Sequence, residues 1–238
     1  MGESTVTEVA TPALVGIPLL DSLTSDERDA LARACRWKKY AGGEQIIDRS
    51  SDSRDVFFVI TGAVRVVIYS LSGREIALDD ISAGGVFGEL AALDGSPRSA
   101  SVMAIGDTTV ASLTAEQFLR VLRDHPDVAL ALMRRLARVI RVSGARILDL
   151  STLGANNRVH ADLLALCRTA KRTPEGHARI RPIPVHSDIA ARVSTTRETV
   201  ARVLNDLSRQ KIVRRDADAL VVLDVERLRD LVEEVRGE

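Results

Sequence analysis

The sequence predicts an α+β protein with an antiparallel β-roll in its N-terminal part, one long helix in the middle, and a helical C-terminal part that carries a β-wing. Three observations predict this order. Short β-branched runs separated by glycines extend to about residue 113, a helical spacing of apolar residues follows, and two amphipathic helices precede a final hairpin-like stretch. With 238 residues, the chain is long enough for two ordinary domains.

The composition is that of a soluble globular protein, with 45% hydrophobic and 28% charged residues. The 33 Lys and Arg residues balance the 33 Asp and Glu residues, so any nucleic-acid binding must come from a local basic patch. No apolar run reaches the roughly 18 residues of a membrane-spanning helix. The first residues also lack the basic and apolar regions of a signal peptide, so we expect a cytoplasmic protein with no membrane partner.

The cysteines and histidines do not predict a metal site. Cys35 and Cys167 lie far apart in apolar, helical-looking contexts, where we expect buried free thiols. The histidines are scattered, without the close spacing that metal ligands on one element need. They are His125, His160, His177 and His186.

The N-terminal part begins with a short helix and continues with strands. The stretch "DERDALARA" predicts the helix, and either Thr24 or Ser25 can cap its start. The stretches "VFFVITGAVRVVIYS", "LSGREIALDDI" and "SASVMAIGDTTVASL" predict short strands. Glycine turns between short strands are typical of an antiparallel β-roll or barrel. The glycines concerned are Gly62, Gly73, Gly84, Gly85 and Gly106.

From about residue 115 to 153 the sequence has a helical period that carries a heptad seam. Such a stripe packs along a partner helix, so it predicts a dimer interface. Ser143 is the polar exception, and a polar residue in a seam often fixes its register at some cost in stability. The seam consists of Met133, Leu136, Ile140, Ser143, Ile147 and Leu150.

The C-terminal part contains two helices at the spacing of a helix-turn-helix. After a helix "NRVHADLLALCRTA" and a turn-rich connection, the stretch "HSDIAARVSTTRETVARVLNDLSRQ" has two apolar faces separated by a short turn. An ordinary helical hairpin has the same pattern. The local charge favours nucleic acid instead, because seven basic residues and two acids lie between residues 192 and 215. The basic residues are Arg192, Arg197, Arg202, Arg209, Lys211, Arg214 and Arg215.

An acid and a base stand out in the stretch "GGVFGELAALDGSPRSASVMA", where Arg98 follows Glu89 by nine residues. The two could form a surface ion pair, which is common and contributes about 0–1 kcal/mol. An anion-binding site explains more residues of this stretch than an ion pair does. Gly88 lets a ligand approach the backbone, and a helical turn presents N–H groups to it. Arg98 then binds a phosphate, and Glu89 accepts a hydrogen bond from a ribose hydroxyl. A catalytic role for Glu89 lacks a partner group, so we do not expect an enzyme.

The stretch "FGELAALDGSPRSASV" resembles the phosphate-binding cassette of cyclic-nucleotide-binding domains. The resemblance implies that Glu89 accepts from the ribose 2′-hydroxyl and that Arg98 and Ser99 hold the cyclic phosphate. It further implies that the backbone from Gly88 to Leu90 completes the pocket. The matching residues are Phe87, Gly88, Glu89, Leu90, Leu93, Pro97, Arg98, Ser99 and Ala100.

The stretch "TTRETVARVL" is similar to the recognition helix of the CRP/FNR family of bacterial regulators, and the order of parts matches over about residues 15 to 230. The resemblance implies that Arg197, Glu198 and Arg202 read base edges, which suits their donor and acceptor groups. It also places Ser143, with Gly144 beside it, where the long helix contacts the nucleotide base. The full DNA-binding set that it implies is Ser187, Thr195, Thr196, Arg197, Glu198, Thr199 and Arg202.

The family resemblance also predicts a domain organisation. It gives a flexible N-terminus at residues 1–16, a cyclic-nucleotide-binding β-roll at 17–127, a dimerisation helix at 128–153 and a winged helix-turn-helix at 154–238.

By this resemblance, the protein is a homodimeric transcription regulator that binds a pseudo-palindromic DNA operator, has cAMP or cGMP as its allosteric ligand and has RNA polymerase as a further partner. An alternative is a family member that binds DNA without nucleotide or responds to another effector. Two cysteines are too few for the four ligands of an iron–sulfur cluster, and nothing indicates a haem site.

Overall fold

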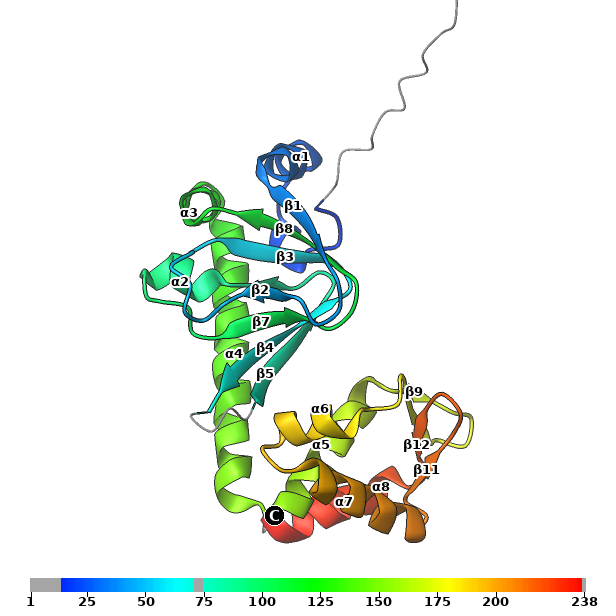
Figure 1. Ribbon diagram of the computed structural model, residues 1–238. Coiled ribbons are helices and arrows are strands. Elements are labelled where there is room, and N and C mark those ends of the chain that lie inside the picture. Colours follow the sequence, from blue (N-terminus) through cyan, green and yellow to red (C-terminus); the bar gives the residue numbers. More distant parts are fainter. Residues whose placement is uncertain (1–13, 71–74, 237–238) are drawn as a thin grey trace, which may run out of the picture. The chain divides into compact units, whose positions relative to one another are not determined.

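The computed structural model describes residues 14–70 and 75–236 (Figure 1). Contacts divide the chain into two units, residues 1–68 with 78–137 and residues 69–77 with 138–238. The α+β class predicted from the sequence is confirmed. Of the N-terminal segment that we expected to be flexible, residues 1–13 lie outside the described part, whereas Leu14 is buried in the core of the first unit.

The N-terminal part of the chain contains two four-stranded sheets, ordered β1-β8-β3-β6 and β2-β7-β4-β5 (Figure 1). The strand pairs that the structure describes in them are antiparallel, as expected for a β-roll. The strands are β1 (Arg36–Tyr40), β2 (Gln45–Ile47), β3 (Val56–Thr61), β4 (Ala63–Tyr69), β5 (Glu75–Ser82), β6 (Val86–Phe87), β7 (Ser101–Ala104) and β8 (Thr108–Leu113).

Strand β3 is buried on both of its faces. Val56 and Phe58 belong to one apolar cluster, which the helices of this unit share, whereas Phe57 and Val59 belong to a second cluster that draws on both sheets. Successive side chains of a strand point to opposite faces, so a strand between two cores needs an unbroken apolar run. The sequence "VFFVIT" meets that need.

The helices of the first unit are capped as the sequence predicts. Helix α1 (Ser25–Ala34) follows the 3-10 turn η1 (Pro18–Leu20), and its N-cap is Thr24, which forms a capping box with Glu27. Helix α3 (Ala115–Asp124) begins in the same way at Thr114. The stretch of helical period from about 115 to 153 consists of two helices, because the chain breaks at His125. Helix α4 (Pro126–Thr152) then starts with a proline, close to the start at 128 that we expected for the dimerisation helix. Proline disfavours the helical conformation of the residue before it and is well suited to a first helical position.

The second unit combines helices with a small antiparallel sheet, ordered β11-β12-β10-β9. The helices α5, α6, α7 and α8 share one apolar cluster with this sheet, and the hairpin of β11 and β12 forms the predicted wing. The elements are α5 (Ala155–Thr169), β9 (Lys171–Arg172), β10 (Ala178–Ile180), α6 (His186–Arg192), α7 (Arg197–Arg209), β11 (Val213–Arg215), β12 (Leu220–Val222) and α8 (Val225–Arg236).

Candidate functional site

Gly88 forms the sharp corner between strand β6 and the short helix α2 (Glu89–Asp94). Its φ of 80° lies in the left-handed region, which glycine adopts without strain. A Cβ atom at this position would lie 2.8 Å from Nη1 of Arg98 and 2.9 Å from the carbonyl oxygen of Asp55. The corner therefore requires glycine both for its backbone angle and for the close approach of the guanidinium group.

Arg98 is almost completely buried, with 4% of its surface exposed. Its Nη1 donates to the carbonyl of Gly88 at 2.8 Å, and its Nη2 donates to the carbonyl of Asp55 at 2.8 Å and to the hydroxyl of Ser53 at 3.1 Å. Burial lowers the pKa of the guanidinium, and the charges of Asp55 and Glu89 partly oppose that shift. The group remains a cation whose position is fixed by the protein.

The Nε atom of Arg98 is buried and has no hydrogen-bond partner among the described residues. An unpaired buried donor is costly in a folded protein, and more so when the group is charged. An anion that accepts from this N–H group would remove the cost. The arrangement therefore favours an anionic ligand at the cassette.

Glu89, the first residue of α2, is 7% exposed and lies against an arginine of helix α4. Nη1 of Arg135 lies 3.4 Å from Oε1 of Glu89, and Nη2 of Arg135 donates to the carbonyl of Val86. The ion pair with Arg135 engages Oε1 and leaves the second carboxylate oxygen, Oε2, outside it. One acceptor atom of Glu89 is thus positioned by an ion pair, while the other is available.

The other residues of the cassette divide between the core and the surface. Phe87 is 2% exposed and stacks on Phe57, with ring centroids 5.0 Å apart and planes 7° apart, so it supports the cassette from within the core. Leu90 and Ser99 are exposed. The structure therefore brings together Gly88, Glu89 and Arg98, with the hydroxyl of Ser99 at the surface.

Ser143 and Gly144 lie on the part of α4 that belongs to the second unit, and both are exposed. The seam around them is also exposed in this single chain: Ile140 is 71% and Ile147 64% accessible. Leu136 differs from its neighbours, because it packs against the core of the first unit. A row of large exposed apolar side chains along one helix is typical of an interaction surface.

The predicted helix-turn-helix consists of α6 and α7. The hydroxyl of Thr196 caps α7 by accepting from the N–H of Thr199 at 3.2 Å. Hydrogen bonds from its own backbone and from Thr196, together with the charge of Arg197, lower the pKa of Glu198 and keep it an ionised acceptor. Arg197, Glu198 and Arg202 are exposed, as is Ser187 on α6, whereas Thr195 and Thr199 are half-buried.

The basic strip from Arg192 to Arg215 is smaller than the sequence suggested, because the structure pairs three of its members with acids. Nη2 of Arg192 lies 2.8 Å from Oδ2 of Asp162 on α5, and Nε of Arg214 lies 3.2 Å from Oδ1 of Asp216. Arg209 forms an ion pair with Asp206. In the part of the chain that the structure describes, four members form no ion pair. These are Arg197, Arg202, Lys211 and Arg215.

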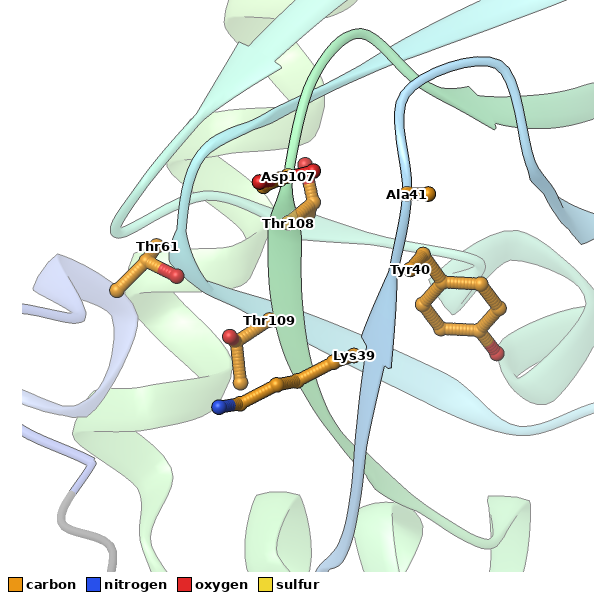
Figure 2. A pocket seen from close by; sticks show the side chains of 7 residues that line it. All are labelled: Lys39, Tyr40, Ala41, Thr61, Asp107, Thr108 and Thr109. Carbon is orange, nitrogen blue, oxygen red and sulfur yellow. The ribbon is translucent and has the colours of Figure 1, made fainter.

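Other kinds of site find less support. Within residues 14–70 and 75–236, no group of three His, Cys, Asp or Glu side chains could hold a metal ion, and no helix is long and apolar enough to cross a membrane. A hollow of about 350 Å³ in the first unit is lined by none of the predicted site residues. Figure 2 shows the side chains that line it. Its lining consists of Lys39, Tyr40, Ala41, Thr61, Asp107, Thr108 and Thr109.

The chain matches two protein-family models. The cyclic nucleotide-binding domain matches residues 37–125, and the Crp-like helix-turn-helix domain matches residues 157–231. The cyclic AMP receptor protein of Thermus thermophilus is 34% identical over 199 residues, which make up 84% of this chain and 89% of that protein.

Solved structures show the same fold. A CooA mutant from Carboxydothermus hydrogenoformans aligns with a TM-score of 0.79 at 24% identity, covering 90% of this chain and 95% of its own. The c-di-GMP responsive global regulator CLP from Xanthomonas campestris aligns with a TM-score of 0.70 at 18% identity, covering 81% of this chain and 95% of its own. Both likenesses concern the fold alone.

Proposed function

Since this chain belongs to the CRP/FNR family of DNA-binding transcription regulators, which are not enzymes, we propose that it is a homodimer whose operator binding is controlled by a cyclic nucleotide. The observation that carries the proposal is the buried guanidinium of Arg98, whose Nε has no acceptor among the residues that the structure describes. A cyclic phosphate supplies that acceptor. The available oxygen of Glu89 suits the ribose 2′-hydroxyl, and Ser99 adds a second donor for the phosphate.

We assign cAMP as the physiological ligand, with cGMP as its competitor. The cassette reads ribose and phosphate, so the choice of base falls to Ser143 and Gly144 of α4. The relative from Thermus thermophilus, named for cyclic AMP, supports this assignment. The alternative is that the effector is different, or that DNA binds without one.

The dimer is proposed from the exposed seam of α4. Two copies of one helix that bury the same face form a two-fold symmetric interface. Such a dimer presents two copies of α7 to DNA, so the operator is a pseudo-palindrome with half-sites about one helical turn apart. The boundaries proposed for the parts remain 17–127, 128–153 and 154–238, and the protein acts in the cytoplasm together with RNA polymerase.

Calorimetric titration of the full chain with cAMP and with cGMP, with and without operator DNA, tests the proposal. We expect one cAMP per protomer, weaker binding of cGMP, and tighter cAMP binding when operator is present. Thermodynamic reciprocity requires that cAMP raise operator affinity by the same factor. Operator binding without any heat from either nucleotide would favour the alternative.

A further inference from the structure

The turn between α6 and α7 presents three consecutive carbonyl groups to arginine side chains of other helices. Nη2 of Arg146, on α4, donates to the carbonyl of Arg192 at 2.6 Å. Nε of Arg158, on α5, donates to the carbonyl of Val193 at 2.9 Å, and its Nη2 donates to the carbonyl of Ser194 at 3.2 Å. All five residues belong to the second unit.

The same guanidinium of Arg158 also reaches the end of α4. Its Nη1 donates to the carbonyl of Leu153 at 2.8 Å, and Leu153 directly follows the last residue of α4. One rigid, planar group therefore joins the junction between α4 and α5 to the turn of the helix-turn-helix. A second contact attaches α6 to α5: Nε and Nη2 of Arg192 donate to the two carboxylate oxygens of Asp162 at 2.9 Å and 2.8 Å.

These bonds satisfy groups that the backbone leaves unpaired. The last carbonyl groups of a helix accept no hydrogen bond from an N–H group of the same helix. Cationic side chains at that end are favourable because they interact with the helix dipole. Ser194 has a φ of 51°, in the left-handed region that most residues avoid, and two residues later Thr196 caps α7. The direction in which α7 leaves the turn thus depends on a strained residue whose carbonyl Arg158 holds.

We propose that Arg146 and Arg158 form a clamp that positions the recognition helix α7 on α4, so that a change in α4 is passed to the DNA-reading face. Neither side chain contacts ligand or DNA in this scheme; both act through the turn. The inference rests on the proposed function in one respect, namely that nucleotide acts on α4. Lysine cannot replace Arg158 fully, because a single ammonium group cannot reach three carbonyls in a fixed fork.

The first test measures the coupling factor, defined as the ratio of operator Kd without cAMP to operator Kd with saturating cAMP, on the full-length protein. We expect Arg158→Met to reduce this factor by about fivefold or more and Arg158→Lys to reduce it less. The matched control is Arg168→Met, an exposed arginine of the same helix. Affinity for cAMP without DNA should stay within about twofold of wild type in every variant. If Arg158→Met weakens operator binding equally with and without cAMP, the clamp is wrong, because that result indicates only general damage.

The second test does not depend on any ligand. Amide hydrogen exchange reports the stability of the bonds from Val193 N–H to Ile189 and from Thr195 N–H to Ala190. We expect these amides to exchange at least about tenfold faster in Arg158→Met than in Arg168→Met. Faster exchange in a protein whose operator binding ignores cAMP would support the clamp and refute the proposed function. Unchanged exchange would refute the clamp, whatever the ligand does.

Discussion

The cassette around Arg98 and the exposed face of α7 both use arginine and glutamate, but they hold these side chains differently. In the cassette, Arg98 is buried and bonded to the backbone, and Glu89 is paired with Arg135. On α7, Arg197 and Arg202 are exposed. A small ligand offers few contacts, so its site must be preorganised, whereas DNA supplies a long row of phosphates and base edges to which free side chains adapt.

The largest expected effect comes from Arg98→Ala. We expect cAMP affinity to fall by more than about 100-fold, because the charged hydrogen bonds to phosphate are lost. Stability should also fall, by about 1–3 kcal/mol, since the carbonyls of Gly88 and Asp55 lose their donor. Calorimetry and thermal unfolding measure the two effects. Arg33→Ala, at an exposed site on α1, serves as the control, and retained cAMP binding in Arg98→Ala would remove the phosphate assignment.

A smaller effect, confined to specificity, is expected on α7. Glu198→Ala should reduce discrimination at one base pair by about 1–3 kcal/mol, because the acceptor for a cytosine amino group is lost. Its cAMP affinity without DNA should match that of wild type. Competition binding against operators with each base pair substituted measures the loss, with Ser208→Ala as the control on the same helix. An unchanged preference at every position would exclude Glu198 from base reading.

Replacing two glycines of the predicted nucleotide site with alanine should change the stability of the protein in opposite directions. Gly88→Ala should destabilise the nucleotide-free protein by about 1–3 kcal/mol, because of its φ and the nearby Arg98. Gly144→Ala should stabilise it by about 0.5–1 kcal/mol, because a Cβ atom there meets nothing within 4 Å and alanine favours the helix. Urea unfolding measures both. A destabilised Gly144→Ala variant would show that this part of α4 is already closely covered.

The least effect is expected at the cysteines, where the two units should behave alike. Burial raises the pKa of the Cys35 thiol to about 12, and burial also raises that of Cys167, with Arg172 partly opposing. A raised pKa keeps the thiol protonated at neutral pH, and the thiolate is the reactive form. Native protein should therefore resist iodoacetamide at pH 7.5, as followed by mass spectrometry. Rapid labelling of either residue would mean that its environment opens readily.

The predictable part of the molecule is the part that rests on local sequence. The α+β class, the capped start of α1 and the apolar faces of α6 and α7 follow from periodicity and capping, which act over a few residues. The break at His125 lies close to the predicted start of the long helix at 128, and Pro126 is its local signal. The cassette was recognised because its residues lie close together in the chain.

Several of the contacts that the sequence does not reveal join residues that are distant in it. Arg135 lies 46 residues from Glu89, and Arg158 lies 35 residues from Val193. The sequence around an arginine on a polar helix face does not reveal which carbonyl or carboxylate group tertiary packing will bring next to it. For the same reason Arg192 belongs to the basic strip predicted from the sequence, although in the structure it forms an ion pair with Asp162.

The stacked pair of Phe57 and Phe87 places the binding cassette directly on the central core. Arg98 lies over the Phe57 ring, 6.0 Å from its centroid, and Phe87 immediately precedes Gly88. A substitution that shifts either ring should therefore lower ligand affinity more than it lowers the stability of the fold. In a random mutant library selected for lost regulation, we expect to find substitutions of these two aromatic residues as well as substitutions of Arg98.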